Sequence, residues 1–131
     1  PAGAAPAGRG GVVSPLLFVG AALAGGVGAA LRYLVDLWVA SVVGRRFPWG
    51  IFAVNLSGSF ALGIVTTALP DQALLLGAGL LGGYTTFSTA MLDTVALWRD
   101  GERPASVFNA IGTLVLGLLA AAAGLLLGAS L

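Results

Sequence analysis

Four long apolar segments constrain the fold of this chain more than any other feature. They cover residues 16–40, 49–69, 72–98 and 105–129, and short polar or proline-containing stretches separate them. About 20 consecutive apolar residues are enough for a helix to cross the hydrocarbon core of a bilayer. Only 8% of the 131 residues are charged, whereas soluble domains carry about 25%. The sequence therefore predicts an all-α, multi-pass protein of the cell membrane with four transmembrane helices, in contact with lipid.

The remaining composition excludes several classes of function. The sequence has neither Cys nor His, so disulfides, thiol chemistry and His-based metal or catalytic sites are excluded. A net charge of +1 argues against binding nucleic acid, which needs a clustered basic surface. The few acids are scattered, and no nucleophile has a base beside it. We therefore expect no enzyme. Residues 1–14, rich in Pro, Gly and Ala, predict a flexible tail.

The arginines indicate an orientation in the membrane. With four spans, the loops before the second and the fourth segment lie on one side, and they carry four of the six basic residues, all of them Arg. Three Trp residues also fall at that side, as is typical of a membrane interface. Cytoplasmic loops are usually enriched in Arg and Lys. The pattern predicts that these loops are cytoplasmic and that both termini lie outside. The residues are Arg45, Arg46, Arg99 and Arg103, with Trp38, Trp49 and Trp98.

Polar residues inside the first, second and fourth segments form stripes. The first segment contains GGVGAALRY at residues 25–33, typical of close helix packing, with an Arg32–Asp36 pair as the simplest interpretation. Arg32 lies too deep for an interface anchor, so we expect it to shape a polar vestibule or hold a helix end. Asn55 and Ser59 share one helix face, as do Asn109 and Thr113. These stripes indicate either hydrogen bonds between helices or the lining of a water-filled path.

The third segment contains the strongest signal, GAGLLGGYTTFST at residues 77–89. Two adjacent glycines followed by four Ser or Thr residues form a poor continuous helix and predict an unwound break near the bilayer middle. Non-helical backbone is tolerated there only where it is buried or lines a cavity or ion site. Freed carbonyls would suit a cation, and freed N–H groups and hydroxyls an anion. The alternative is a glycine kink in which Ser and Thr hydroxyls bond to the preceding turn.

Three motifs together carry a resemblance to a known family. They are GGVGAALRY at residues 25–33, GIFAVNLSGSFALG at 50–63 and GGYTTFST at 82–89. In order, spacing and number of spans the sequence resembles the CrcB/Fluc family of fluoride channels from about Leu16 onward. The resemblance implies a four-helix transmembrane channel domain over residues 15–131 that exports fluoride passively. It also implies a dual-topology antiparallel dimer with two pores, and a structural Na⁺ at its centre held by backbone carbonyls of Gly82 and Thr85.

The resemblance and the polar stripes together define candidate site residues. Asn55 and Phe87 match pore-lining positions of the family, and Arg32 matches its first-helix arginine. Amide and hydroxyl groups replace water around fluoride without a fixed charge that would trap the ion, and an aromatic ring presents an electropositive edge. The candidate fluoride-pore residues are Asn55, Ser59, Thr86, Phe87, Ser88, Thr89, Asn109 and Thr113.

Two departures from the family pattern leave the partner open. Ala90 and Met91 occupy the positions where the family usually has a second Phe and then a Ser. On the last helix, Asn109 and Thr113 replace the family's Tyr and Ser. The missing ring and the arginine bias favour a heterodimer with an inverted sibling over a homodimer. Two other functions stay open: a four-helix multidrug or cation antiporter, for which Asp36 is too near the segment's end, and a non-conducting partner subunit of a heteromeric fluoride channel.

Overall fold

A computed structural model describes residues 13–131, which are helical apart from short connections. Most of the tail predicted at residues 1–14 lies outside this part. The all-α prediction is confirmed, and three helices, α1, α2 and α5, are long and apolar enough to cross a membrane. The predicted third segment is instead a series of shorter elements. The elements are α1 (Pro15–Val43), α2 (Trp49–Ala68), η1 (Pro70–Gln72), η2 (Ala73–Leu81), α3 (Gly82–Tyr84), α4 (Phe87–Arg99) and α5 (Arg103–Ser130).

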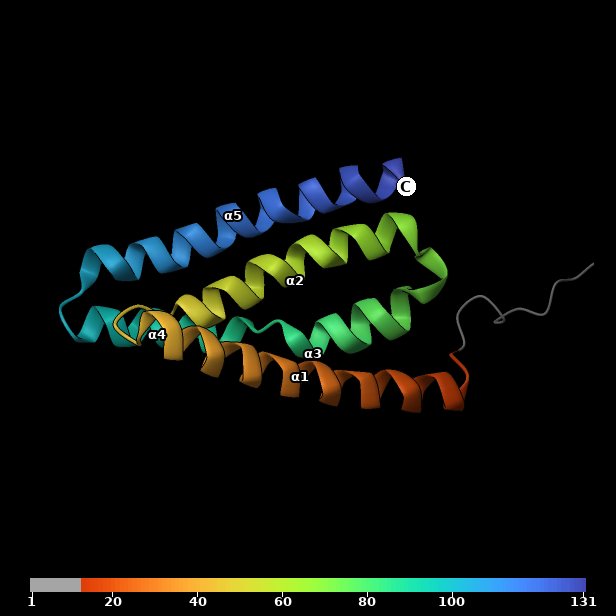
Figure 1. The fold of residues 1–131 in the computed structure, drawn as a ribbon, viewed down its shortest axis with the longest axis horizontal. Helices are drawn as coiled ribbons and strands as arrows, with labels where there is room; N and C mark the ends of the chain where they lie inside the picture. Colours follow the sequence, from red (N-terminus) through yellow and green to blue (C-terminus); the bar gives the residue numbers. More distant parts are fainter. Residues whose placement is uncertain (1–12) are drawn as a thin grey trace, which may run out of the picture.

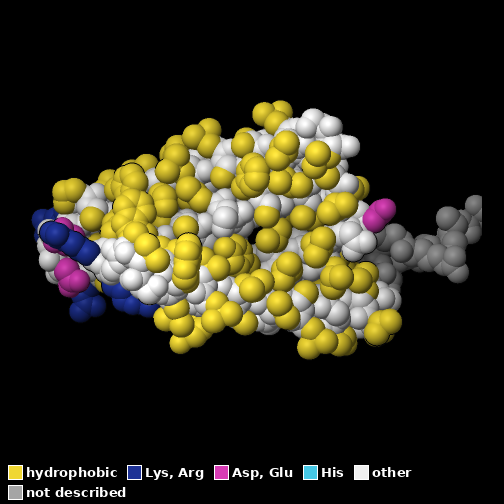
Figure 2. Space-filling view, in the orientation of Figure 1, with side chains coloured by type: hydrophobic (Ala, Val, Ile, Leu, Met, Phe, Trp, Pro, Cys, Tyr) yellow, Lys and Arg dark blue, Asp and Glu magenta, His cyan; other side chains and the backbone are white. Residues whose placement is uncertain are grey.

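The elements form an elongated bundle (Figure 1). Helix α2 runs beside α5, while α1 packs against η2 and α3. The connections at residues 44–48 and 100–102 lie at one end of the bundle, which we call the arginine-rich end. The charged side chains visible in Figure 2 gather mainly at this end, and apolar side chains cover the middle. This distribution suits a bundle with its middle in lipid.

Local sequence explains where α1 begins and ends. The Ser14 hydroxyl accepts a hydrogen bond from the Leu17 N–H at 3.1 Å, and Pro15 occupies the first helical position. Both features are typical of helix N-termini. The helix ends at Val43 because Gly44 adopts a φ of 80°, which L side chains rarely adopt. The short turn that follows brings α2 back along α1.

Glycines allow the elements to approach at backbone distance. On the α2–α5 side, a Cβ at Gly63 would overlap the Ala121 carbonyl oxygen, and one at Gly124 would overlap that of Phe60. On the other side, a Cβ at Gly83 would overlap the carbonyl oxygen of Gly25. In lipid no hydrophobic effect draws helices together, so close packing of small residues stabilises their contact. The predicted packing role of the glycines in the first motif is confirmed for Gly28, where a Cβ would overlap the Leu80 carbonyl oxygen.

Gly83→Ala is expected to lower stability because its methyl group has no space beside α1. Overpacking of this kind costs about 1–3 kcal/mol. Gly26→Ala is the matched control, because nothing lies within 4 Å of a Cβ at that position. Thermal unfolding of both variants in detergent, followed by circular dichroism, checks the prediction. Equal midpoints for the two variants would contradict the close contact between α1 and α3.

Candidate functional site

The backbone leaves the helical conformation at two residues between α3 and α4. Thr85 (φ −80°, ψ 157°) and Thr86 (φ −150°, ψ 126°) are extended, whereas Gly82, the first residue of α3, is helical. The extended residues thus follow the glycine pair instead of including it. The Thr86 hydroxyl accepts a hydrogen bond from the Thr89 N–H at 3.3 Å, which caps α4. We call Thr85 and Thr86 the extended pair.

The side-chain amide of Asn55, on α2, forms hydrogen bonds with both the carbonyl and the N–H of Thr86. Its Nδ2 donates to the Thr86 carbonyl at 2.8 Å, and its Oδ1 accepts from the Thr86 N–H at 2.8 Å. Asn55 is 8% exposed, and unpaired backbone groups at such depth would be costly. Because the Thr86 N–H bonds to Asn55, the Gly82 carbonyl lacks the donor that a continuous helix would supply. The Asn55 amide therefore holds the extended pair in place.

Arg32 and Asp36 are not partners, so the i, i+4 pair, which was the simpler interpretation of this motif, is wrong. Arg32 Nη1 donates to the Thr85 carbonyl at 3.2 Å. Asp36 instead forms an ion pair with Arg45, with 3.7 Å between Oδ2 and Nη1. The fold brings α1 against α3, which gives the Arg32 guanidinium a backbone acceptor across the bundle. Arg32 thus places a positive charge directly beside the extended pair.

A cavity of about 600 Å³ opens next to the extended pair, between α2, α4 and α5. Phe87, 78% exposed, stands at this cavity, which we call the Phe87 cavity. The Thr113 hydroxyl is the one buried side-chain N or O atom within residues 13–131 that has no hydrogen-bond partner. Ala90 and Met91, which replace the second Phe and the Ser of the family pattern, also line the Phe87 cavity. Five candidate residues meet at the cavity: Asn55, Ser59, Thr86, Phe87 and Thr113.

Three further candidates lie elsewhere. Asn109 is 2% exposed and is not among the residues lining the Phe87 cavity. Its Nδ2 donates to the Ala90 carbonyl at 3.2 Å and to the Thr94 hydroxyl at 2.9 Å, so it joins α5 to α4. The Ser88 hydroxyl lies 3.4 Å from that of Thr86 on an exposed surface. The Thr89 hydroxyl accepts from that of Thr86 at 3.2 Å.

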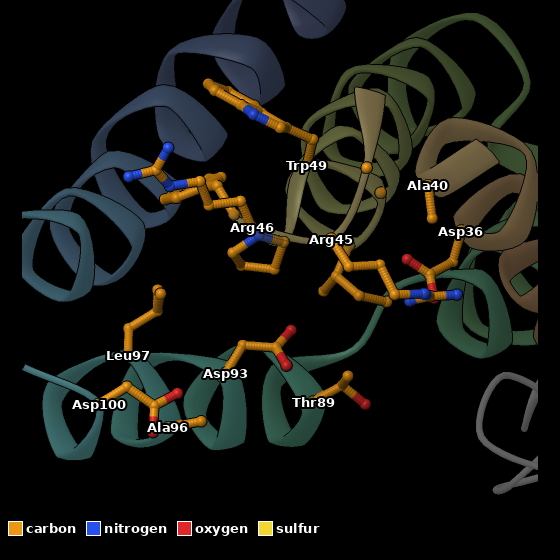
Figure 3. A pocket seen from close by; sticks show the side chains of 15 residues that line it. Asp36, Ala40, Arg45, Arg46, Trp49, Thr89, Asp93, Ala96, Leu97 and Asp100 are labelled. Carbon is orange, nitrogen blue, oxygen red and sulfur yellow. The ribbon is translucent and has the colours of Figure 1, made fainter. Parts of the chain in front are cut away.

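A second cavity, which was not predicted from the sequence, has a volume of about 320 Å³ and lies at the arginine-rich end. We call it the end cavity (Figure 3). Its polar lining comes from α1, α4 and the connections between α1 and α2 and between α4 and α5. The only hint in the sequence is that Asp36 and Asp93 fall near the same ends of their segments. The charged or hydroxyl residues that line it are Asp36, Arg45, Arg46, Thr89, Asp93 and Asp100.

The polar groups that line these two cavities are suited to binding a small ion. Hydroxyl and amide groups around the Phe87 cavity can donate hydrogen bonds to a small anion. Within residues 13–131 no group of three His, Cys, Asp or Glu side chains could hold a metal ion. Backbone carbonyls such as that of Gly82 are a separate class of ligand.

Comparison with known proteins gives a consistent result. The family model for "CrcB-like protein, Camphor Resistance (CrcB)" matches residues 19–125. "Fluoride-specific ion channel FluC 1" of Rubrobacter xylanophilus is 52% identical over 109 residues, which are 81% of this chain and 88% of the relative. "Fluoride-specific ion channel FluC 2" of Mycobacterium tuberculosis is 46% identical over 82% of this chain and 87% of the relative. "Fluoride-specific ion channel FluC" of Agrobacterium fabrum is 40% identical over 84% of this chain and 94% of the relative.

Proposed function

The chain belongs to the CrcB-like family, and we propose that it is a fluoride channel that lets fluoride leave the cell passively across the membrane. One observation in the fold carries this proposal: the extended pair, held by Asn55, lies beside a cavity with hydroxyl donors and an exposed aromatic ring. The names of relatives with 40–52% identity agree with it.

The lining of the Phe87 cavity suits fluoride. Fluoride is small, strongly hydrated and a good hydrogen-bond acceptor, so a pore has to replace its water with donors. Thr113 has a hydroxyl without a partner within the described residues, and Asn55 retains one N–H after bonding to Thr86. The edge of the Phe87 ring carries partial positive charge. None of these groups has a full charge, so the ion is bound weakly enough to leave.

We further propose that η2, α3 and α4 together form one membrane span, broken at the extended pair, and that two chains pair in antiparallel orientation. The Phe87 side chain is 78% exposed. Exposure of a large apolar ring to water is unfavourable, so we expect lipid or a partner chain to cover it. A second chain on this face would close the open side of the Phe87 cavity. Ala90 and the concentration of arginines at one end favour an inverted sibling as partner, and an identical chain is the alternative.

Sodium at the centre of such a dimer is a part of the same proposal. The carbonyl of Gly82 has lost its helical donor to Asn55, which leaves its oxygen free to act as a ligand. The Thr85 carbonyl already accepts from Arg32 and has one lone pair left. Two carbonyls from each chain would surround the ion, and it would fix the two broken spans against each other.

Fluoride tolerance in cells tests the proposed function. Expression of this chain in a bacterial strain without fluoride export is expected to restore growth in fluoride, alone or together with an inverted sibling. Passive flow predicts that collapse of the proton gradient does not stop export from preloaded vesicles. A requirement for the proton gradient would favour the antiporter instead. If growth is not restored by this chain alone or by this chain with an inverted sibling, although the protein is present in the membrane, the proposed channel function is contradicted.

A further inference from the structure

The end cavity contains more negative than positive groups. Three carboxylates line it: Asp36 of α1, Asp93 of α4 and Asp100 of the connection between α4 and α5. The connection between α1 and α2 contributes two guanidinium groups. Figure 3 shows the Asp93 carboxylate directed into the cavity and the Arg45 side chain extended toward Asp36. The Arg46 side chain extends the other way, away from Asp36. Of the two arginines, Arg45 is therefore the one paired with Asp36, the single carboxylate of α1.

Hydrogen-bonded hydroxyl groups lie between the end cavity and the Phe87 cavity. Thr89 lines the end cavity and Thr86 lines the Phe87 cavity. The hydroxyl oxygens of these two threonines are 3.2 Å apart, and that of Ser88 is 3.4 Å from that of Thr86. An anion that leaves the end cavity thus meets hydroxyl donors up to the extended pair. Asp93 lies one helical turn beyond Thr89, so its charge acts on the start of this route.

On the basis of the proposed function, we propose that the end cavity is the mouth of the fluoride route at the arginine-rich end, and that Arg45 sets the rate at which fluoride enters it. Carboxylates at a mouth repel an anion, because a cleft concentrates the field of its charges. The guanidinium of Arg45 offsets this repulsion.

The ion pair of Arg45 with Asp36 contributes little to folding. The two groups are 3.7 Å apart; the Arg45 side chain is 62% exposed and the Asp36 side chain 25% exposed. An ion pair whose cation is mostly in solvent has a small effect on stability. Loss of the Arg45 charge therefore changes the potential in the mouth without unfolding the bundle, which separates an electrostatic role from a structural one.

The test measures the initial rate of fluoride efflux from liposomes containing the conducting assembly with wild-type or Arg45→Gln chain. At about 0.01 M ionic strength, Arg45→Gln is expected to slow efflux about fivefold. At about 1 M, set with an impermeant salt, the difference should fall below about twofold, because the Debye length shortens from about 30 Å to about 3 Å. Arg46→Gln is the matched control: it removes the same charge and should slow efflux much less. Adding Asp36→Asn to Arg45→Gln should restore most of the rate.

The outcomes distinguish this inference from the function on which it rests. A wild-type assembly without fluoride efflux would overturn both. A conducting wild type with Arg45→Gln equal to it at low ionic strength would overturn the role of Arg45 and leave the channel standing. Equal slowing of efflux by Arg45→Gln and Arg46→Gln would also overturn the role of Arg45, since the effect would then depend on the net charge of the cavity and not on this arginine. Slowing that persists at 1 M salt would indicate a structural defect and contradict the electrostatic role.

Discussion

Asn55→Leu is expected to abolish fluoride flux. Leucine is close in size to asparagine but can form neither bond to the backbone of Thr86, which Asn55 makes at 2.8 Å on both sides. Each buried polar group left unpaired costs about 1–3 kcal/mol. The extended pair would then shift to recover hydrogen bonds, and the Phe87 cavity would lose both its shape and the free Asn55 N–H. Fluoride efflux from liposomes, normalised to the folded protein recovered from size-exclusion chromatography, measures the effect.

Thr66→Val is the control for Asn55→Leu. It also replaces a polar side chain of α2 by an apolar one of similar size, but the Thr66 hydroxyl bonds only to the Leu62 carbonyl of its own helix. We expect near wild-type flux from it. Asn55→Asp separates the two bonds, since it keeps the acceptor for the Thr86 N–H but loses the donor. If Asn55→Leu folds and conducts as fast as Thr66→Val, the extended pair is not part of the fluoride route.

Arg32→Gln is expected to reduce fluoride flux by at least about tenfold while the protein still folds. Arg32 donates to the Thr85 carbonyl at 3.2 Å and places a full positive charge beside the extended pair. A charge in a medium of low dielectric constant acts strongly on a nearby anion. Glutamine keeps a hydrogen-bond donor and removes the charge, whereas Arg32→Lys keeps the charge and loses the planar fork.

The two Arg32 variants therefore give different results for different roles. If the charge matters, Arg32→Lys conducts better than Arg32→Gln. If only the hydrogen bond to Thr85 matters, Arg32→Gln conducts as well as Arg32→Lys or better. Thermal unfolding in detergent serves as the second measurement for both. Wild-type flux from a folded Arg32→Gln chain would exclude an electrostatic role for this arginine.

Hydrophobic pattern alone was enough to predict the long helices. The apolar segments at 16–40, 49–69 and 105–129 correspond to α1, α2 and α5 within a few residues, because unbroken apolar runs in lipid must satisfy their backbone within a helix. The third segment could be predicted only in part. The glycine pair at residues 82 and 83 indicated non-helical backbone in this region, but the extended residues are Thr85 and Thr86. Their position depends on hydrogen bonds from Asn55 of another helix.

Other parts of the site depend on contacts that no local pattern reveals. Asn109 and Thr113 lie one turn apart in sequence, yet Asn109 bonds to α4 while Thr113 lines the Phe87 cavity. The first turns of α5 are joined to α4, because the Ser106 hydroxyl also donates to the Thr94 carbonyl at 2.6 Å. Likewise, Asp36 pairs with Arg45 because the turn at Gly44 folds the connection back over α1.

The most direct test of the channel is ion efflux from liposomes that contain the purified chain, alone and with an inverted sibling. Liposomes are loaded with potassium fluoride or potassium chloride, and external halide is recorded with selective electrodes after a potassium ionophore is added. We predict rapid release of fluoride and little release of chloride in at least one of the two preparations. A folded protein that releases neither ion in either preparation, or both ions equally, would contradict a fluoride-selective channel.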